Sequence, residues 1–127
     1  MRGFFERAHL TSYLMRCYHM AVCLVEKIDE YDDLSYIRCH ELARAVKTTM
    51  FGDDEAQIVD GLMNSVDHTW ILLFTHGVIL DVYTPGRLPM VQMIHHHTFI
   101  ARQYAVGAAR TDIREDVVKM LMDKMRY

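Results

Sequence analysis

The stretch HTWILLFTHGVILDVY, residues 68–83, decides the fold that we predict for this chain. Its two halves are rich in β-branched and aromatic residues and almost wholly apolar, and a turn containing Gly77 separates them. This pattern is typical of a β-hairpin. Strands that are apolar on both faces are usually covered on both, so we expect helices or other chain to pack over this sheet.

The hairpin carries two polar residues, His68 and Asp81, whose relation depends on its register. Side chains alternate between the two faces of a strand. If Leu73 pairs with Val78 across a four-residue loop, His68 lies on the same face as Asp81, as its diagonal neighbour. Diagonal neighbours are about 7–8 Å apart at the backbone, within reach for these side chains. A three-residue loop would put the two groups on opposite faces.

Residues with helical periodicity flank this hairpin on both sides. Apolar residues recur at three- and four-residue steps over residues 4–30, about 35–50 and from about Asp112 onwards. We expect Asp33 or Ser35 to cap the second helix, while Asp112 and Glu115 have capping-box spacing at the start of the last.

Three further short runs resemble strands: QIVDG at 57–61, MVQMI at 90–94 and TFIARQY at 98–104. We therefore predict a single compact α+β domain over residues 1–127. Two N-terminal helices pack on a small antiparallel sheet of three to five strands, and a C-terminal helix follows. The length of 127 residues fits one hydrophobic core.

Composition excludes several classes of function. The 14 Lys and Arg residues against 17 Asp and Glu leave a net charge of −3 and no basic stripe for nucleic acid. No apolar run approaches the ~18 residues of a membrane span, and charges such as Arg7 and Arg16 interrupt the N-terminal segment. We expect a reducing, cytoplasmic setting (the host cytoplasm if the protein is viral), without nucleic-acid or membrane partners. The sequence does not indicate an oligomeric state.

The three cysteines, Cys17, Cys23 and Cys39, match no disulfide or zinc pattern. Cys39 differs from the others because it lies near the start of the second predicted helix. Unpaired amides and the positive end of a helix dipole favour a thiolate there. The alternative is that Cys39, on an apolar helix face, is simply a buried thiol.

Cys39, His68 and Asp81 follow one another in the order that a thiol acyl-transfer site needs. A thiolate attacks, an imidazole moves the proton, and a carboxylate holds the imidazole in one tautomer. The opposing interpretation is one buried cysteine and an ordinary hairpin.

These residues and their local sequences, CHELARAV, HTW and ILDVY, resemble the papain-like and transglutaminase-like thiol enzymes. In that core a helix begins with the catalytic Cys and packs on an antiparallel sheet that carries the His and then an Asp or Asn. The resemblance covers about residues 35–83. It implies that Cys39 is the nucleophile, His68 the general base and Asp81 the orienting group.

No counterpart of the Gln or aromatic residue that often completes the oxyanion site is apparent, although the Cys39 amide could serve. We expect Trp70, Tyr83 and Arg87 to contact substrate, with Trp70 and the 84–89 loop forming the wall of the cleft. No cofactor is implied.

The sequence thus predicts a small cysteine hydrolase or acyltransferase acting on an amide, isopeptide or thioester bond. The alternative is a non-catalytic module that binds a partner protein, for which 10 Met residues would supply an adaptable surface. The Met-rich chain and its DVYTPGRLP loop also loosely resemble small uncharacterised proteins of bacterial viruses, so that partner could be a host factor.

Metal binding is a weaker possibility at two places. Zinc held by Cys39, His40 and His68 is disfavoured because adjacent helical residues diverge by about 100°. The run His95–His97 is more typical of an exposed polar turn than of a metal site.

Overall fold

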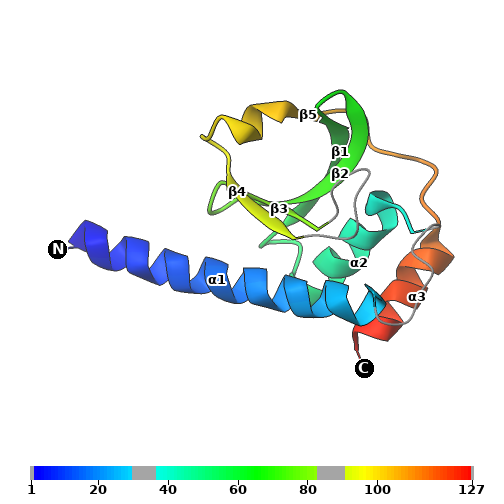
Figure 1. Ribbon diagram of the computed structural model, residues 1–127, viewed down its shortest axis with the longest axis horizontal. Coiled ribbons are helices and arrows are strands. Elements are labelled where there is room, and N and C mark those ends of the chain that lie inside the picture. The colour runs from blue at the N-terminus through cyan, green and yellow to red at the C-terminus, as the bar shows by residue number, and fades with distance from the viewer. Residues whose placement is uncertain (1, 30–36, 83–90, 127) are drawn as a thin grey trace.

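The computed structural model describes residues 2–29, 37–82 and 91–126 of the chain, with side chains from residue 12 to 28, 37 to 82 and 91 to 126. The described residues form an α+β fold, as the sequence predicts (Figure 1). Its elements, in chain order, are α1 (Arg2–Asp29), α2 (Cys39–Met50), β1 (Gln57–Met63), β2 (Val66–Leu73), β3 (Val78–Asp81), β4 (Gln92–His95), the 3-10 helix η2 (Ile100–Gln103), β5 (Tyr104–Val106) and α3 (Glu115–Met125).

The five strands form one antiparallel sheet in the order β4-β3-β2-β1-β5. The sheet curls strongly, so that its two edge strands come round towards η2, which contacts both (Figure 1). Successive strands are neighbours in the sheet except for β5, which returns to pair with β1. This return brings residues near position 104 beside the central hairpin.

The central hairpin has the register on which the predicted site depends. Leu73 pairs with Val78, which leaves a four-residue loop between β2 and β3. Gly77 has a positive φ of 62°, a left-handed conformation that glycine adopts without steric cost. His68 and Asp81 therefore project from the same face of the sheet.

The two faces of the sheet build two separate apolar clusters. One face packs on the helical layer, with α2 against the strands, and contributes Ile71, Leu73 and Leu80 to the main core. The other face is covered by the curl of the sheet itself, where Trp70 and Ile79 form a smaller cluster. The expected covering of both faces is therefore present: the α-helices cover one face, and η2 adds Ala101 to the cluster inside the curl. Among the described residues, no helix combines the length and apolar character needed to cross a membrane.

Helix α2 begins later than the sequence suggested. Its first helical residue is Cys39, and Arg38 is the N-cap, with extended φ and ψ of −94° and 155°. The prediction of a start at Ser35, capped by Asp33 or Ser35, was wrong because Ile37 and Arg38 are already non-helical. Asp33 and Ser35 themselves lie outside the described residues. The later start puts Cys39 directly at the helix terminus.

Two predictions near the C-terminus were also wrong in detail. Helix α3 begins at Glu115 with Arg114 as N-cap, because the Asp112 carboxylate is bound by the side chains of Arg38 and Arg110 rather than capping the helix. The run 98–104 is mostly turn and 3-10 helix, and only its last residue belongs to a strand. Its apolar residues lack the alternation that a strand pairing along its full length requires.

We predict that Gly61→Ala destabilises the protein by about 1–3 kcal/mol, the usual cost of overpacking. A Cβ at Gly61 would lie 2.1 Å from the backbone oxygen of Ala105, so the pairing of β1 with β5 would have to shift. The free energy of unfolding, from urea denaturation, measures the effect. Gly52→Ala is the matched control, because the Cβ there meets only the side chains of Asp54 and Glu55 closely. Equal stability of the two variants would contradict the β1–β5 packing.

Candidate active site

Cys39 occupies the first position of α2 and is only 6% exposed. The first α-helical hydrogen bond of α2 runs from Leu42 N to Arg38 O, at 3.1 Å. The amides that precede Leu42 thus have no partner within the helix and point out of its N-terminal end. These N–H groups and the helix dipole stabilise a negative charge on the Cys39 sulfur.

His68 and Asp81 form a buried pair inside the curled sheet. Nε2 of His68 lies 2.9 Å from Oδ1 and 2.8 Å from Oδ2 of Asp81, and the two residues are 0% and 1% exposed. Because an ionised carboxylate only accepts hydrogen bonds, Nε2 must carry a hydrogen. In the neutral ring the lone pair is then on Nδ1, which is the nitrogen available to take a proton.

The ring of His68 is held by two aromatic residues. Trp70 and Tyr104 each have their ring centroid 6.2 Å from that of His68, and they contact one another edge to face at 5.1 Å. The Tyr104 hydroxyl also donates a hydrogen bond of 2.6 Å to Oδ2 of Asp81. Burial and the neighbouring Asp81 carboxylate raise the pKa of Tyr104, so its hydroxyl remains a donor. Tyr104 thus fixes the position of the Asp81 carboxylate, which in turn orients the His68 ring.

The thiol and the imidazole perturb one another. Burial raises the pKa of the Cys39 thiol, but His40 and His68 outweigh this effect and lower it to about 6. Burial lowers the pKa of His68, but Asp81 and Cys39 outweigh this effect and raise it to about 9. Nδ1 of His68 is buried and has no hydrogen-bond partner in the described part of the chain. The raised pKa nevertheless includes hydrogen bonding between the protonated ring and the Cys39 sulfur as well as the charge of the thiolate.

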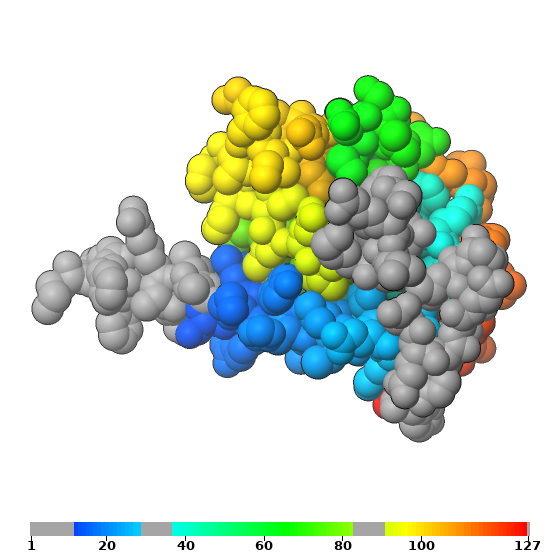
Figure 2. Space-filling model, in the orientation of Figure 1, coloured from blue at the N-terminus to red at the C-terminus, as the bar shows by residue number. Residues whose placement is uncertain are grey.

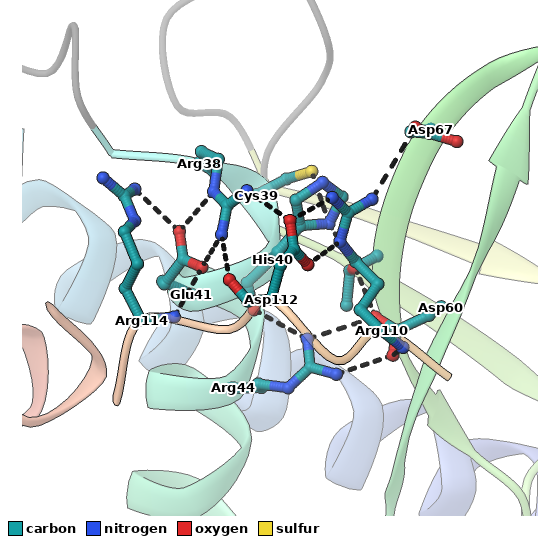
Figure 3. A network of polar contacts seen from close by, with 11 residues as sticks. Arg38, Cys39, His40, Glu41, Arg44, Asp60, Asp67, Arg110, Asp112 and Arg114 are labelled. Atoms are coloured by element: carbon teal, nitrogen blue, oxygen red, sulfur yellow. Dashed lines mark hydrogen bonds and ion pairs between the residues drawn. The ribbon is translucent and has the colours of Figure 1, made fainter. Parts of the chain in front are cut away.

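A second buried chain of polar groups starts from the same sulfur. Nδ1 of His40 lies 3.6 Å from the Cys39 sulfur and 2.6 Å from Oγ1 of Thr69. The Thr69 hydroxyl donates to Oδ1 of Asp60 at 2.7 Å, and Arg44 binds both oxygens of Asp60 at 3.1 and 2.6 Å. Figure 3 labels the two ends of this chain, Cys39 and His40 at the start of α2 and the pair of Arg44 with Asp60.

An arginine–carboxylate network surrounds the start of α2 (Figure 3). Glu41, fully buried, is bound by Arg38, the N-cap of α2, and by Arg114, the N-cap of α3. Although burial opposes ionisation, these bonds lower the pKa of Glu41 to about 2. Asp112 joins the network through Arg38 and Arg110. The terminus of α2 is therefore tied to the segment that precedes α3.

The structure brings His68 and Asp81 into contact and puts Cys39 close enough to shift the pKa of His68. Trp70 is 3% exposed and packs beside His68 within the curl. Tyr83 and Arg87, the other expected substrate contacts, lie outside the described residues, as does the 84–89 loop.

Four residues of the site are absent from the triad that the sequence suggested: His40, Asp60, Thr69 and Tyr104. Asp60 lies in the strand-like run QIVDG, and a carboxylate in an otherwise apolar strand is a signal of a buried partner. The predicted divergence of Cys39 and His40 was wrong, since the sulfur and Nδ1 lie 3.6 Å apart. Neighbouring helical side chains can converge at the first turn, where no preceding turn restricts their rotamers.

Within the described ranges, no group of three or more His, Cys, Asp or Glu side chains is arranged to hold a metal ion. His95, His96 and His97 are exposed at the end of β4 and in the turn that follows it. Nδ1 of His96 lies 2.7 Å from the backbone oxygen of Gly77 in the facing hairpin loop.

Comparison with models of protein families, with curated proteins and with solved structures gave no match. The chemistry of the site is therefore argued from its own residues.

We predict that the Cys39 thiolate forms with an inflection near pH 6. The thiol pKa of about 6 and the imidazole pKa of about 9 favour a thiolate–imidazolium pair between these values. Iodoacetamide labelling against pH, read by peptide mass spectrometry, measures the inflection for each cysteine. Cys23, which is exposed, is the internal reference, and thiolate ultraviolet absorbance provides a readout that does not need reagent access. An inflection at or above ~8.5, the ordinary thiol value, would contradict the prediction.

Proposed function

We propose that the protein is a small cysteine hydrolase or acyltransferase, resembling the papain-like and transglutaminase-like enzymes, that acts on an amide, isopeptide or thioester bond. One observation carries the proposal: Asp81 binds Nε2 of His68 and leaves Nδ1 without a partner in the described chain, beside a thiol at a helix terminus. Cys39 is the nucleophile, His68 the proton shuttle and Asp81 the orienting group.

In the reaction, the Cys39 thiolate attacks the carbonyl carbon of the substrate and forms a tetrahedral oxyanion. The N-terminal amides of α2, including that of Cys39, are the donors available to stabilise the oxyanion. The His68 imidazolium gives its Nδ1 proton to the leaving amine or thiol, and an acyl-thioester on Cys39 results. Water or an acceptor amine then attacks the thioester while Nδ1 removes its proton. The acyl group leaves, and the thiolate–imidazolium pair is restored.

The low exposure of Cys39 suits a nucleophile that acts on a bond inserted into a cleft. In this proposal Trp70 supports the His68 ring from within the curl. Substrate contacts by Trp70, Tyr83 and Arg87 remain predictions from the sequence. A reducing compartment such as the cytoplasm would keep the Cys39 thiol free.

The proposal is tested by acyl-enzyme formation with an activated ester, p-nitrophenyl acetate. We expect a burst of nitrophenol, and an acetyl group on Cys39 in the mass spectrum of the digested protein. Cys39→Ala should abolish both signals, whereas Cys23→Ser should leave them unchanged. Acetylation spread equally over the three cysteines, or absent from folded protein, would refute the enzymatic function.

We predict that Asp81→Asn raises the inflection of the Cys39 labelling profile towards the ordinary thiol value of ~8.5. The substitution is nearly isosteric but removes the charge that favours an imidazolium, so the thiolate loses its counter-ion. It also allows the His68 ring to adopt the other tautomer.

Asp67→Asn is the matched control, because Asp67 adjoins His68 on β2 but its side chain is 71% exposed. Circular dichroism checks that both variants fold. An unchanged profile in folded Asp81→Asn would remove Asp81 from the site.

A second candidate is a non-catalytic module that binds a partner protein. The supporting observation is the exposure of Met15 and Met20 on α1, at 48% and 54%. Met20 also lines a hollow of about 230 Å³ at the end of α2. Figure 2 shows the α1 residues, in blue, along one exposed edge of the molecule. Flexible methionines suit an adaptable contact surface. This candidate predicts an unreactive Cys39 and no acyl-enzyme.

A further inference from the structure

We propose that His40 is a second hydrogen-bond donor to the reacting sulfur, held in its Nδ1–H tautomer by a buried chain through Thr69 and Asp60. The two imidazoles then divide the work: His40 holds the negative charge of the sulfur, and His68 moves the proton. The division of work rests on the proposed function, whereas the donor role of His40 does not.

The direction of the hydrogen bonds follows from the far end of the chain. Both oxygens of Asp60 are bound by Arg44, and Oδ2 also accepts the backbone N–H of Arg110 at 3.0 Å. These bonds, together with the Thr69 hydroxyl, lower the pKa of Asp60 against the effect of burial, so the carboxylate is ionised and can only accept. The Thr69 hydroxyl must therefore donate its single hydrogen to Oδ1 of Asp60, 2.7 Å away.

The state of the imidazole follows from that of Thr69. With its hydrogen donated to Asp60, Oγ1 of Thr69 faces His40 as an acceptor, and Nδ1 of His40 is 2.6 Å from it. Two acceptors could not approach so closely, so Nδ1 carries a hydrogen. A ring nitrogen that carries a hydrogen has no lone pair, so it cannot serve as the base for the thiol. It can only donate.

The same N–H faces the sulfur. Nδ1 of His40 lies 3.6 Å from the Cys39 sulfur, within the longer range of hydrogen bonds to sulfur, and His40 is itself buried. The hydrogen is thus shared between a neutral hydroxyl oxygen and a thiolate. When the thiolate becomes an acyl-thioester and loses its charge, the N–H keeps Thr69 as a partner. No buried donor is left unpaired at either stage of the reaction.

His68 is held in the opposite protonation pattern, with its hydrogen on Nε2 and its Nδ1 open to exchange a proton. Asp81 binds the hydrogen on Nε2 of His68 and leaves Nδ1 to exchange a proton. The two imidazoles are therefore fixed in different states by carboxylates on different strands, Asp60 on β1 and Asp81 on β3. In His40 the nitrogen nearest the sulfur is a donor, and in His68 the unpaired nitrogen is the base.

The test compares His40→Leu with His40→Asn, in which an amide N–H can replace Nδ1–H. We expect His40→Leu to raise the Cys39 inflection by about one pH unit, the usual scale of a hydrogen bond to a charged group. His40→Asn should move it by clearly less. The pH profile of the acylation rate with p-nitrophenyl acetate should shift by the same amount. The rate on its high-pH plateau should stay within a few-fold of that of the unaltered protein. A merely structural role would lower the plateau and leave the inflection in place.

The result that overturns the donor role is an unchanged Cys39 inflection in folded His40→Leu. If His40→Leu does not fold, two-dimensional ¹H–¹⁵N spectra of the histidine rings in the unaltered protein decide the question. They should show His40 with hydrogen on Nδ1, and hydrogen on Nε2 alone would overturn the proposal. A raised inflection without acylation in any variant would support the donor role of His40 and refute the enzymatic function.

Discussion

The buried pair of His68 and Asp81 is the interaction on which the rest of the site depends. Neither ionised group would be tolerated alone in the apolar interior of the sheet, because breaking such a pair by removing one partner typically costs about 3–5 kcal/mol. The pair thus also specifies the hairpin register, since a shift by one residue would separate the two groups onto opposite faces. Tyr104 binds the same carboxylate and so links β5 to the pair.

The position of Cys39 depends on a different set of buried charges. Glu41 ties the first turn of α2 to Arg114, at the start of α3, and Arg44 ties the second turn to Asp60 on β1. Each carboxylate is almost wholly buried and bound by arginine, so neither is left as an uncompensated charge. The helix terminus is therefore fixed at two points relative to the sheet. That rigidity gives the thiol a defined distance from both imidazoles.

Local patterns in the sequence predicted the α+β class and the central hairpin but left its loop at three or four residues, and the structure has four. His68 and Asp81 could be predicted as neighbours because both lie in one hairpin, where register alone decides contact. The start of α2 could not, because Arg38 has no capping side chain and its extended backbone leaves no mark in the sequence. The contacts of His40 with Thr69 and of Tyr104 with Asp81 join segments far apart in the chain, and no local pattern reports such contacts. Asp112 shows the converse, since its capping-box spacing is overridden by Arg38 and Arg110.

In the proposed function, Asp81 and the Cys39 thiolate keep the His68 ring positively charged at neutral pH. The protonation of its two ring nitrogens, followed by ¹⁵N chemical shift between pH 5 and 10, measures this directly. The account predicts an imidazolium that persists through neutral pH and loses its Nδ1 proton near pH 9, in agreement with the raised pKa of His68. A neutral ring at pH 7 that titrates at or below ~6.5, the ordinary histidine value, would contradict the account.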